Sequence, residues 1–415
     1  MKLKVGHVSD AHFQNTKLLP GIIRCGDFIV QRMEKEEPDL ICVAGDTLDF
    51  YKGDIQLGSP AARAATDFVF RLAQIAPLAV VRGTVNHDGT DSLLDFERLK
   101  TRFPIRVSDK LEQVLWCPDD GFIVLRSTDK GYCCERAKAI ISFLPAVNKA
   151  GLLAAGTDGG VDDTNRETEN LLRDVIAGWG IRNAQATTDG LVPILVAHLT
   201  VIGSRFSSGQ VAIGREIEAS LGDLMLGNFR LGCLGHVHAS QEWQGPGWWI
   251  GYSGSIERLD YAEMESKGVY IHELSTNDNA IISTFFETPA RQMRTLRAEG
   301  LPDASVMADV QPGENVRLVY EIGEEEIGAV DEAELKRIAL EKGAASVTVE
   351  HTTRPIVRVR AANISKETTN MGRLAMWAQA TGVEITEGPV SKLALIEEAE
   401  TGAIIGGYEN LSPKP

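Results

Sequence analysis

No stretch of this 415-residue chain holds the ~18 consecutive apolar residues that a membrane-spanning helix requires. We therefore expect no membrane segment, and because Met1 leads directly into the strand-like LKVGHVS, we expect no signal peptide. The chain also lacks a C-x-x-C pair among its six cysteines, and Cys42 and Cys233 lie inside apolar runs. Buried, reduced thiols are typical of the cytosol, so the expected location is cytoplasmic.

Positive charge is scarce, because 42 Lys and Arg stand against 58 Asp and Glu, for a formal net charge of −16. Nonspecific binding to nucleic acid depends on basic surface, so the composition argues against a protein that coats DNA or RNA. An enzyme acting on nucleic acid is not excluded, because bound cations and a local basic strip can act against an acidic background.

The first 275 residues alternate short apolar runs with helical patterns, which predicts an α/β domain. The later connections are shorter, so we expect part of the sheet to be antiparallel. Strands are expected at 3–9, 40–45, 78–83, 122–126, 139–143, 191–197, 231–235, 248–253 and 268–274. Helices are expected at 21–36, 61–75 and 166–180, and NAQATTDG at 183–190 is expected to be an exposed loop.

The remaining chain predicts a second, smaller unit. Prolines and polar residues at 286–312 indicate a linker after a first domain at 1–285. A strand, a helix, two further strands and a helix then follow in a small α+β domain at 313–396, before a tail at 397–415.

Five polar motifs follow apolar runs, at the strand ends where open α/β sheets bind ligands. They are Asp10-Ala11-His12, Gly45-Asp46-Thr47-Leu48-Asp49, Gly83-Thr84-Val85-Asn86-His87-Asp88, His198 and Gly235-His236-Val237-His238. This ordered set of Asp, Asn and His suits two hard-to-borderline metal ions that share a carboxylate. Two such ions form a clamp for the hydrolysis of phosphate esters.

Taken singly, most of these motifs also have a structural explanation. Asp10 and His12 can form a turn, Asp46 can cap a helix, and His198 can be a satisfied core residue. The third motif contains three residues that each have a possible role at a metal site. Asn86 offers an amide oxygen as a ligand, His87 can act as a general acid or orient a phosphate, and the next residue, Asp88, can hold the His87 ring.

Together and in this order, the motifs resemble the signature of calcineurin-like metallophosphoesterases: D-x-H, G-D-x-x-D, G-N-H-D, H and G-H-x-H. The segment YSGSIERLD at 252–260, followed by Lys267-Gly268, is similar to SbcD-type nucleases, as are residues 197–204 and the C-terminal unit. In that family the nuclease processes DNA double-strand breaks with an SMC-like ATPase, SbcC. The resemblance implies a metallophosphoesterase sandwich of mixed sheets flanked by helices, with a small α+β capping domain.

The resemblance also implies roles for individual residues and a cofactor. One ion would take Asp10, His12, Asp46 and His238, and the other would take Asp46, Asn86, His198 and His236. His87 would be the catalytic histidine, with Asp88 beside it. The family favours manganese, and mixed imidazole and carboxylate ligands suit Mn, Fe or Zn better than Mg or Ca.

Two departures from the family pattern are visible. The family has Gly directly before Asn, whereas this chain has Val85 there and Gly83-Thr84 ahead of it, so the turn is expected to differ. No amphipathic helix of useful length is expected in the tail. A contact with an ATPase partner is therefore elsewhere, reduced or absent.

The leading hypothesis is a manganese-dependent DNA exonuclease or endonuclease that acts on DNA ends in repair or recombination, as a homodimer. The alternatives are a phosphoesterase acting on small or cyclic nucleotides and a non-catalytic DNA-end scaffold. Arg354, Arg358 and Arg360 form a candidate phosphate track, or else a solvated strand face. The apolar faces of helices expected near 60–75 and 91–101 suit either a dimer contact or core packing.

Overall fold

The computed structural model describes residues 2–51, 55–56, 58–89, 92–126, 136–146, 161–207, 218–326, 328–354 and 364–398. The chain divides into two compact units. The larger comprises Met1–Ala298, Pro302–Val319 and Asp331–Glu350, and the smaller comprises Glu299–Leu301, Tyr320–Val330 and His351–Pro415. None of the described helices is long and apolar enough to cross a membrane.

The first sheet of the larger unit has six strands in the order β15-β14-β1-β2-β3-β4. Its strands are β1 (Lys2–Val8), β2 (Leu40–Ala44), β3 (Leu78–Val81), β4 (Ile105–Ser108), β14 (Gly268–Ser275) and β15 (Ile281–Glu287). Strands β1 to β4 are parallel to one another. Strand β14 pairs antiparallel with β1, and β15 pairs antiparallel with β14. The parallel strands therefore end at one edge, which is where the first three polar motifs begin.

The second sheet has seven strands in the order β12-β13-β11-β8-β7-β5-β6. They are β5 (Glu112–Cys117), β6 (Gly121–Leu125), β7 (Ala139–Leu144), β8 (Val192–His198), β11 (Leu231–Gly235), β12 (Gln241–Gly245) and β13 (Trp248–Tyr252). The central strands are parallel and the outer ones antiparallel. A two-stranded sheet pairs β9 (Thr200–Val201) with β10 (Glu218–Ala219).

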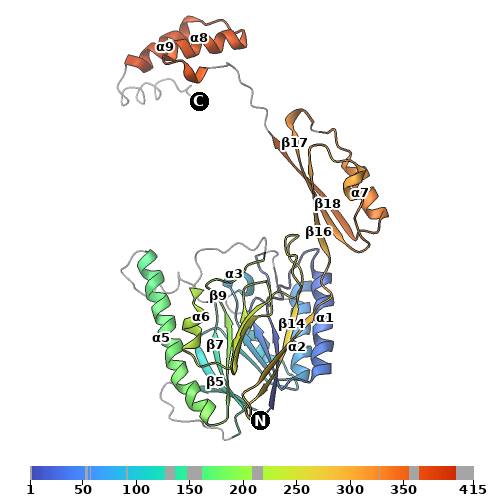
Figure 1. Cartoon of the computed structure of the whole chain (residues 1–415), viewed down its shortest axis with the longest axis vertical. Coiled ribbons are helices and arrows are strands. Elements are labelled where there is room, and N and C mark those ends of the chain that lie inside the picture. The colour runs from blue at the N-terminus through green and yellow to red at the C-terminus, as the bar shows by residue number, and fades with distance from the viewer. Residues whose placement is uncertain are drawn as a thin grey trace. The chain divides into compact units, whose positions relative to one another are not determined.

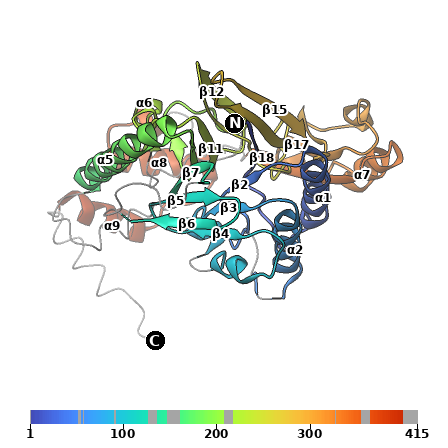
Figure 2. The same ribbon diagram turned by 90° about the horizontal axis from the view of Figure 1, so that it is seen from below.

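The two sheets lie face to face with helices on both outer faces, as Figure 2 shows. On one side lie α1 (Leu19–Glu36) and α2 (Pro60–Ile75), and on the other lie α5 (Val161–Thr188) and α6 (Leu221–Met225). Short helical turns follow β3, as α3 (Val85–Asp88) and η1 (Leu94–Arg98). Separate apolar clusters fill the space between the sheets and beneath each helical layer. The expected sandwich of mixed sheets flanked by helices is confirmed.

The apolar face of α2 is part of the core. Ala65, Phe68, Val69 and Leu72 are buried in the cluster that α2 shares with α1. The helix expected near 91–101 is instead the short η1, whose Phe96 is buried. Core packing therefore accounts for both apolar faces, and neither supports a dimer contact.

The loop expected at 183–190 is wrong, because α5 continues to Thr188. Asn183 is buried inside this helix, where its amide nitrogen donates to the carbonyl oxygen of Gly227 at 2.7 Å. Its amide oxygen accepts from Gln113 at 3.1 Å. A polar sequence is thus kept helical by tertiary hydrogen bonds.

The linker expected at 286–312 is also wrong, because it contains a strand and a helical turn. Strand β16 (Met293–Glu299) joins β17 (Asn315–Gly323) and β18 (Ser346–Arg354) in a three-stranded sheet, and η2 (Ala304–Met307) follows it (Figure 1). Met293 and Met307 are buried, which explains why the segment is ordered. The remaining elements are η3 (Glu324–Glu326), α7 (Glu332–Glu341), η4 (Ile364–Lys366), α8 (Asn370–Thr381) and α9 (Glu387–Glu398).

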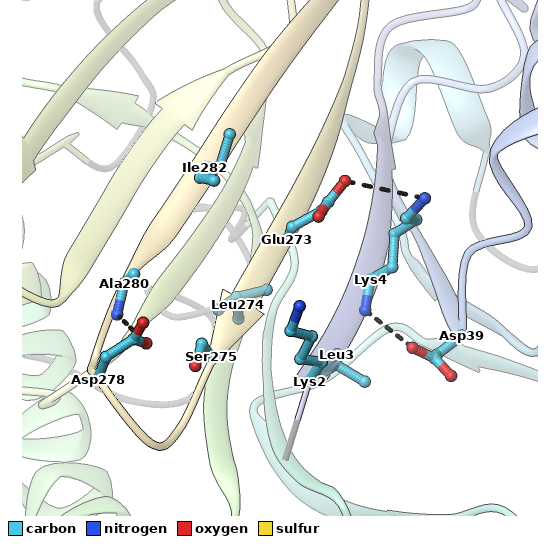
Figure 3. Close-up of a pocket in the computed structure, with 10 residues that line it drawn as sticks. All are labelled: Lys2, Leu3, Lys4, Asp39, Glu273, Leu274, Ser275, Asp278, Ala280 and Ile282. Atoms are coloured by element: carbon cyan, nitrogen blue, oxygen red, sulfur yellow. Dashed lines mark hydrogen bonds and ion pairs between the residues drawn. The ribbon is translucent and has the colours of Figure 1, made fainter.

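A depression in the larger unit lies at the amino end of β1, lined by Lys2, Lys4, Asp39 and Glu273 among others (Figure 3). The Lys4 ammonium already lies 3.6 Å from Glu36 and 3.8 Å from Glu273. Asp10 follows the opposite end of the same strand, so this depression is separate from the polar motifs.

Candidate metal centre

The polar motifs are turned toward one another by unusual backbone conformations just past the strand ends. Asp10, His12 and Asp46 have φ values of 50°, 50° and 49°, and His236 has φ 100°. Such left-handed conformations are uncommon outside glycine and cost free energy, so the surrounding structure must enforce them. The amide of Asp10 donates to the carbonyl of Gly45 at 3.0 Å, and the amide of His12 donates to that of Asp46 at 3.0 Å. These bonds tie the first two motifs together.

One ligand cluster combines Asp10, His12 and His238, each with a ligand atom within 4.8 Å of the others. The Nε2 atoms of His12 and His238 lie 3.1 Å apart. The Asp10 carboxylate accepts from the backbone amide of His236 at 3.0 and 3.1 Å, which joins the first and last motifs at the site. Asp10 and His12 are buried.

A second cluster combines Asp46, His198 and His236 within the same distance limit. Asp46 Oδ2 lies 3.2 Å from His198 Nε2 and 4.0 Å from both His12 Nε2 and His87 Nε2. This single oxygen therefore faces both clusters. Burial alone would raise the pKa of Asp46, but His198, His87 and His12 hold it well below its usual range.

Two of the histidines are oriented through their second ring nitrogen. His198 Nδ1 lies 2.7 Å from the carbonyl oxygen of Ala44, and His238 Nδ1 lies 3.0 Å from Glu263 Oε1. Metal-binding histidines are usually held this way, because the outer partner fixes the tautomer and leaves the other nitrogen for the metal. The His198 Nε2 atom is buried, and it faces the Asp46 carboxylate at 3.2 Å.

Glu263 belongs to the segment after β13 that resembles SbcD-type nucleases, although the sequence did not reveal its role. Its second oxygen lies 2.9 Å from the ammonium of Lys267, which is buried and also donates to the carbonyl of His238 at 3.1 Å. Burial alone would raise the pKa of Glu263, but His238 and Lys267 lower it to about 2. The segment thus builds a charged support beneath His238.

His87 is held by Asp49, not by Asp88 as the sequence suggested. His87 Nδ1 lies 2.9 Å from Asp49 Oδ1, and the histidine side chain keeps 26% of its surface exposed. Burial alone would lower the pKa of His87, but Asp49 and Asp46 outweigh it and raise the pKa to about 9. Asp49 was visible in the second motif, yet its partner could be found only from the fold.

Asp88 instead anchors the loops. Its buried carboxylate accepts from the backbone amides of Asp46 at 2.9 Å, Leu48 at 3.0 Å and Gly83 at 2.7 Å. Burial and the Asp46 charge raise the pKa of Asp88 to about 7. These hydrogen bonds connect the second and third motifs. They account for the buried position of Asp88 without any contact between Asp88 and the His87 ring.

Asn86, the remaining expected ligand, lies on α3 next to His87. Its side chain is exposed on α3, and among the described residues it makes no hydrogen bond. Thr84 takes the place beside Asp46, since its amide and its hydroxyl donate to Asp46 Oδ1 at 2.7 and 3.1 Å. A Cβ atom on Gly83 would lie 2.1 Å from that same oxygen, so glycine is needed there.

The donor set fits divalent metal ions. Carboxylates and imidazoles converge from several strand ends, and the buried His198 Nε2 faces the Asp46 carboxylate at 3.2 Å. A bound cation would accept the lone pairs of the imidazoles and neutralise the buried carboxylates, whose charge is costly in a protein interior without a partner. This mixture of imidazole and carboxylate ligands suits manganese, iron and zinc alike.

Of the three arginines expected to contact substrate, only Arg354 lies in the described part of the chain. It ends β18, where its Nε lies 3.0 Å from Glu321 and its side chain is 68% exposed. Arg358 and Arg360, the second strand expected after β18 and the tail from 399 onward lie outside the described residues.

Most of the chain is similar to known proteins. The family model for calcineurin-like phosphoesterases matches residues 3–240. A Staphylococcus epidermidis protein, named as a subunit of the nuclease SbcCD, is 23% identical over 304 residues, which cover 71% of each chain. A solved dimetal phosphatase from Danio rerio has a TM-score of 0.40 and 11% identity, covering 69% of this chain and 99% of that one.

Proposed function

This chain belongs to the calcineurin-like phosphoesterase family, and from that premise we propose that it is a metal-dependent DNA nuclease acting at DNA ends, in repair or recombination. The observation that carries the proposal is the pair of ligand clusters around one Asp46 oxygen. The similarity to a nuclease subunit over most of the chain favours DNA over other phosphoesters.

We assign one divalent ion to Asp10, His12, Asp46 and His238, and the other to Asp46, His198 and His236. Asp46 Oδ2 is the atom positioned to be shared. When bound, two such ions lower the pKa of a water and stabilise the attacking and leaving oxygens of a phosphodiester. We propose manganese as the preferred metal, as in the family that the chain resembles.

The protein's own contribution beside the ions is His87. With Nδ1 held by Asp49, the ring turns Nε2 toward the side of the site where Asp46 Oδ2 lies, at 4.0 Å. From there it can donate a hydrogen bond to a phosphate oxygen or a proton to the departing oxygen. Asp49 is a positioning residue in this scheme, and Asp88 holds the loops that carry both.

In our assignment Asn86 is not a ligand of the second ion. Thr84 supports that ion indirectly, through Asp46. By donating twice to Asp46 Oδ1, it leaves Oδ2 to face the two clusters. We expect Thr84→Val, which keeps the shape and removes the hydroxyl, to weaken metal binding about 10–100-fold, the usual effect of losing an outer partner of a ligand. Asn86→Ala should leave affinity within about twofold.

Isothermal titration of metal-free protein with Mn²⁺ measures both variants beside wild type. A large loss in the Asn86 variant with none in the Thr84 variant would restore Asn86 as the ligand. It would also mean that α3 rearranges when the metal binds.

Arg354, Arg358 and Arg360 remain our proposal for a phosphate track, because phosphate contacts fix the register of DNA without reading sequence. Changing all three to Ala should weaken duplex binding and reduce the dependence of log K on log salt by roughly one unit for each lost contact. Hydrolysis of a small aryl phosphodiester should be unchanged, because these residues are distant in sequence from the metal ligands.

The matched control replaces Lys336, Arg337 and Lys342 with Ala, which removes the same charge from α7 and its end. Binding isotherms at several salt concentrations distinguish the two sets. Equal losses in both would mean that only overall charge matters and that the three arginines form an ordinary solvated strand face.

The enzymatic alternative is a phosphoesterase for small or cyclic nucleotides, which the same two-ion site would also serve. Comparing kcat/KM for end-labelled duplex DNA, single-stranded DNA and a cyclic nucleotide separates them. The proposal expects a preference for DNA. A higher kcat/KM for the cyclic nucleotide would replace it, and binding of DNA ends without any hydrolysis would favour a scaffold.

The Staphylococcus epidermidis relative is named as one subunit of a nuclease called SbcCD. By analogy we include an SMC-like ATPase partner and a homodimer in the proposal. Light scattering of the purified chain, alone and with DNA, tests the dimer directly.

A further inference from the structure

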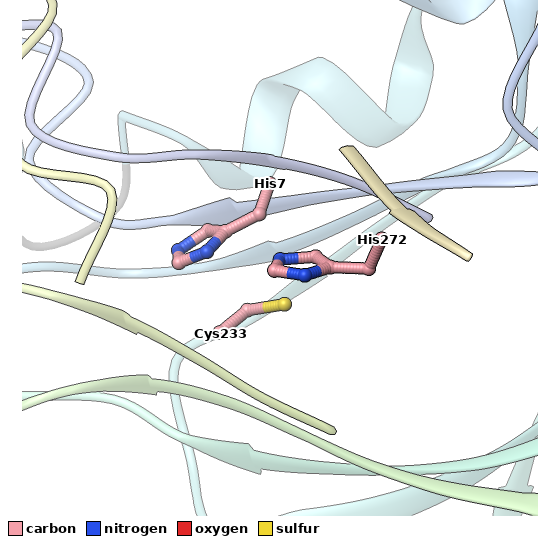
Figure 4. Close-up of side chains that lie close together, drawn as sticks. All are labelled: His7, Cys233 and His272. Carbon is pink, nitrogen blue, oxygen red and sulfur yellow. The ribbon is translucent and has the colours of Figure 1, made fainter. Parts of the chain in front are cut away.

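A separate group of metal-type side chains lies between the two sheets, apart from the candidate metal centre. His7 projects from β1, His272 from β14 and Cys233 from β11, so both sheets contribute (Figure 4). One ligand atom of each lies within 4.8 Å of the others. All three residues have 0% of their surface exposed, so any ion there would be fully enclosed.

Each histidine has one nitrogen held and one left over. His7 Nε2 lies 3.0 Å from the carbonyl oxygen of Leu234, and His272 Nδ1 lies 2.8 Å from the hydroxyl of Ser283. The other two nitrogens, His7 Nδ1 and His272 Nε2, are buried without a hydrogen-bond partner. An outer partner on one nitrogen and a vacant second nitrogen is the arrangement found in metal-binding histidines.

The protonation of His7 suits ligation. A carbonyl oxygen only accepts, so Nε2 carries the hydrogen and Nδ1 carries the lone pair. Burial lowers the pKa of His7 to about 4 and lowers that of His272 as well, so both rings are neutral near neutral pH. The stacked rings, with centroids 5.9 Å apart, lie beside each other in the core.

A fourth group stands next to the cluster. The register between β1 and β2 pairs His7 with Cys42, and burial together with the neighbouring Cys42 raises the pKa of the Cys233 thiol. Both are free, buried cysteines. Two thiolates would balance the charge of a divalent ion, which matters because an uncompensated charge is strongly disfavoured in a protein interior.

We propose that His7, His272 and Cys233 bind one structural zinc ion that fastens the two sheets together beneath the catalytic edge, and that the neighbouring Cys42 moves its side chain to supply the fourth ligand. Two imidazoles and two thiolates form a common structural zinc set. Binding would release the two thiol protons and leave the site neutral. His7 lies three residues before Asp10 and Cys233 three before His236, so the ion would also steady strands that carry catalytic ligands.

Metal analysis of the full-length protein tests the proposal. After extended dialysis against a chelator, which empties the more accessible catalytic centre, wild type should retain one zinc per chain. The Asp46→Ala variant should retain it too, because its change lies in the other site. Cys233→Ala should lose it, whereas Cys25→Ala, which removes a buried cysteine elsewhere in the core, should not.

Cobalt substitution supplies a second measurement, whose signal cannot come from the catalytic ligands. Cobalt bound to thiolate gives an intense charge-transfer absorption in the near ultraviolet, and no residue assigned to the catalytic centre is a cysteine. Protein produced with cobalt in place of zinc should show this band in wild type and lose it in Cys233→Ala. Folded wild type with neither retained zinc nor the band would overturn the proposal and leave a bound water as the partner of the two nitrogens.

Discussion

Replacing Asp46 with alanine should abolish DNA cleavage and remove bound metal from both sites. Asp46 Oδ2 faces His198 at 3.2 Å and His12 at 4.0 Å, so its loss removes a ligand from each ion. Two bound ions each supply several kcal/mol of transition-state stabilisation, and about 1.4 kcal/mol corresponds to a tenfold rate change. We therefore expect cleavage to fall by more than ~10⁴-fold.

Metal content by mass spectrometry and cleavage of labelled DNA measure the effect together. Asp95→Ala makes the same chemical change at an exposed position on η1 and should behave as wild type. If the Asp46 variant kept wild-type metal occupancy, the shared-carboxylate assignment would be wrong.

Replacing His87 with alanine should separate chemistry from binding. The ring is held by Asp49 and also lies within 4.8 Å of ligand atoms of His12 and Asp46, yet our metal-ligand assignment does not include it. General acid–base groups contribute roughly 10²–10⁴-fold, so cleavage should fall by about that factor while metal content and DNA affinity stay near normal.

Asp49→Asn provides the matched comparison, because it keeps a side chain of the same size against His87 Nδ1. Loss of an orienting partner typically costs about 10–100-fold, so its effect should be smaller than that of His87→Ala. Single-turnover cleavage with saturating metal measures both variants. Loss of one metal ion from His87→Ala would instead make His87 a ligand.

The strand ends that carry the motifs could be predicted because each combines a largely buried strand with an abrupt polar stop. β2, LICVA, and β8, VPILVAH, are buried along their whole length, so a ligand is expected directly after β2 and at the last residue of β8, His198. Two of the missed strands lack this contrast, whereas the missed β5, EQVLWC, is fully buried but begins with two polar residues. β12 is QEWQG and β15 is IISTFFE, and neither is continuously buried, so pairing with neighbours decides their structure.

The residues that support the site could not be predicted from local sequence. Glu263 reaches His238 from 25 positions away, and Asp49 reaches His87 across 38. Asn86 was chosen because amides are good ligands, and in the structure its side chain is exposed. Thr84 takes its place beside Asp46 because the backbone turn places both its amide and its hydroxyl there.

The most direct test of the central claim is digestion of end-labelled duplex DNA by protein freed of metal, with Mn²⁺ returned in steps. The two-ion account predicts no cleavage in chelator and full recovery as Mn²⁺ fills both sites, in wild type but not in Asp46→Ala. Cleavage that survives exhaustive chelation, or that recovers equally in the Asp46 variant, would contradict it.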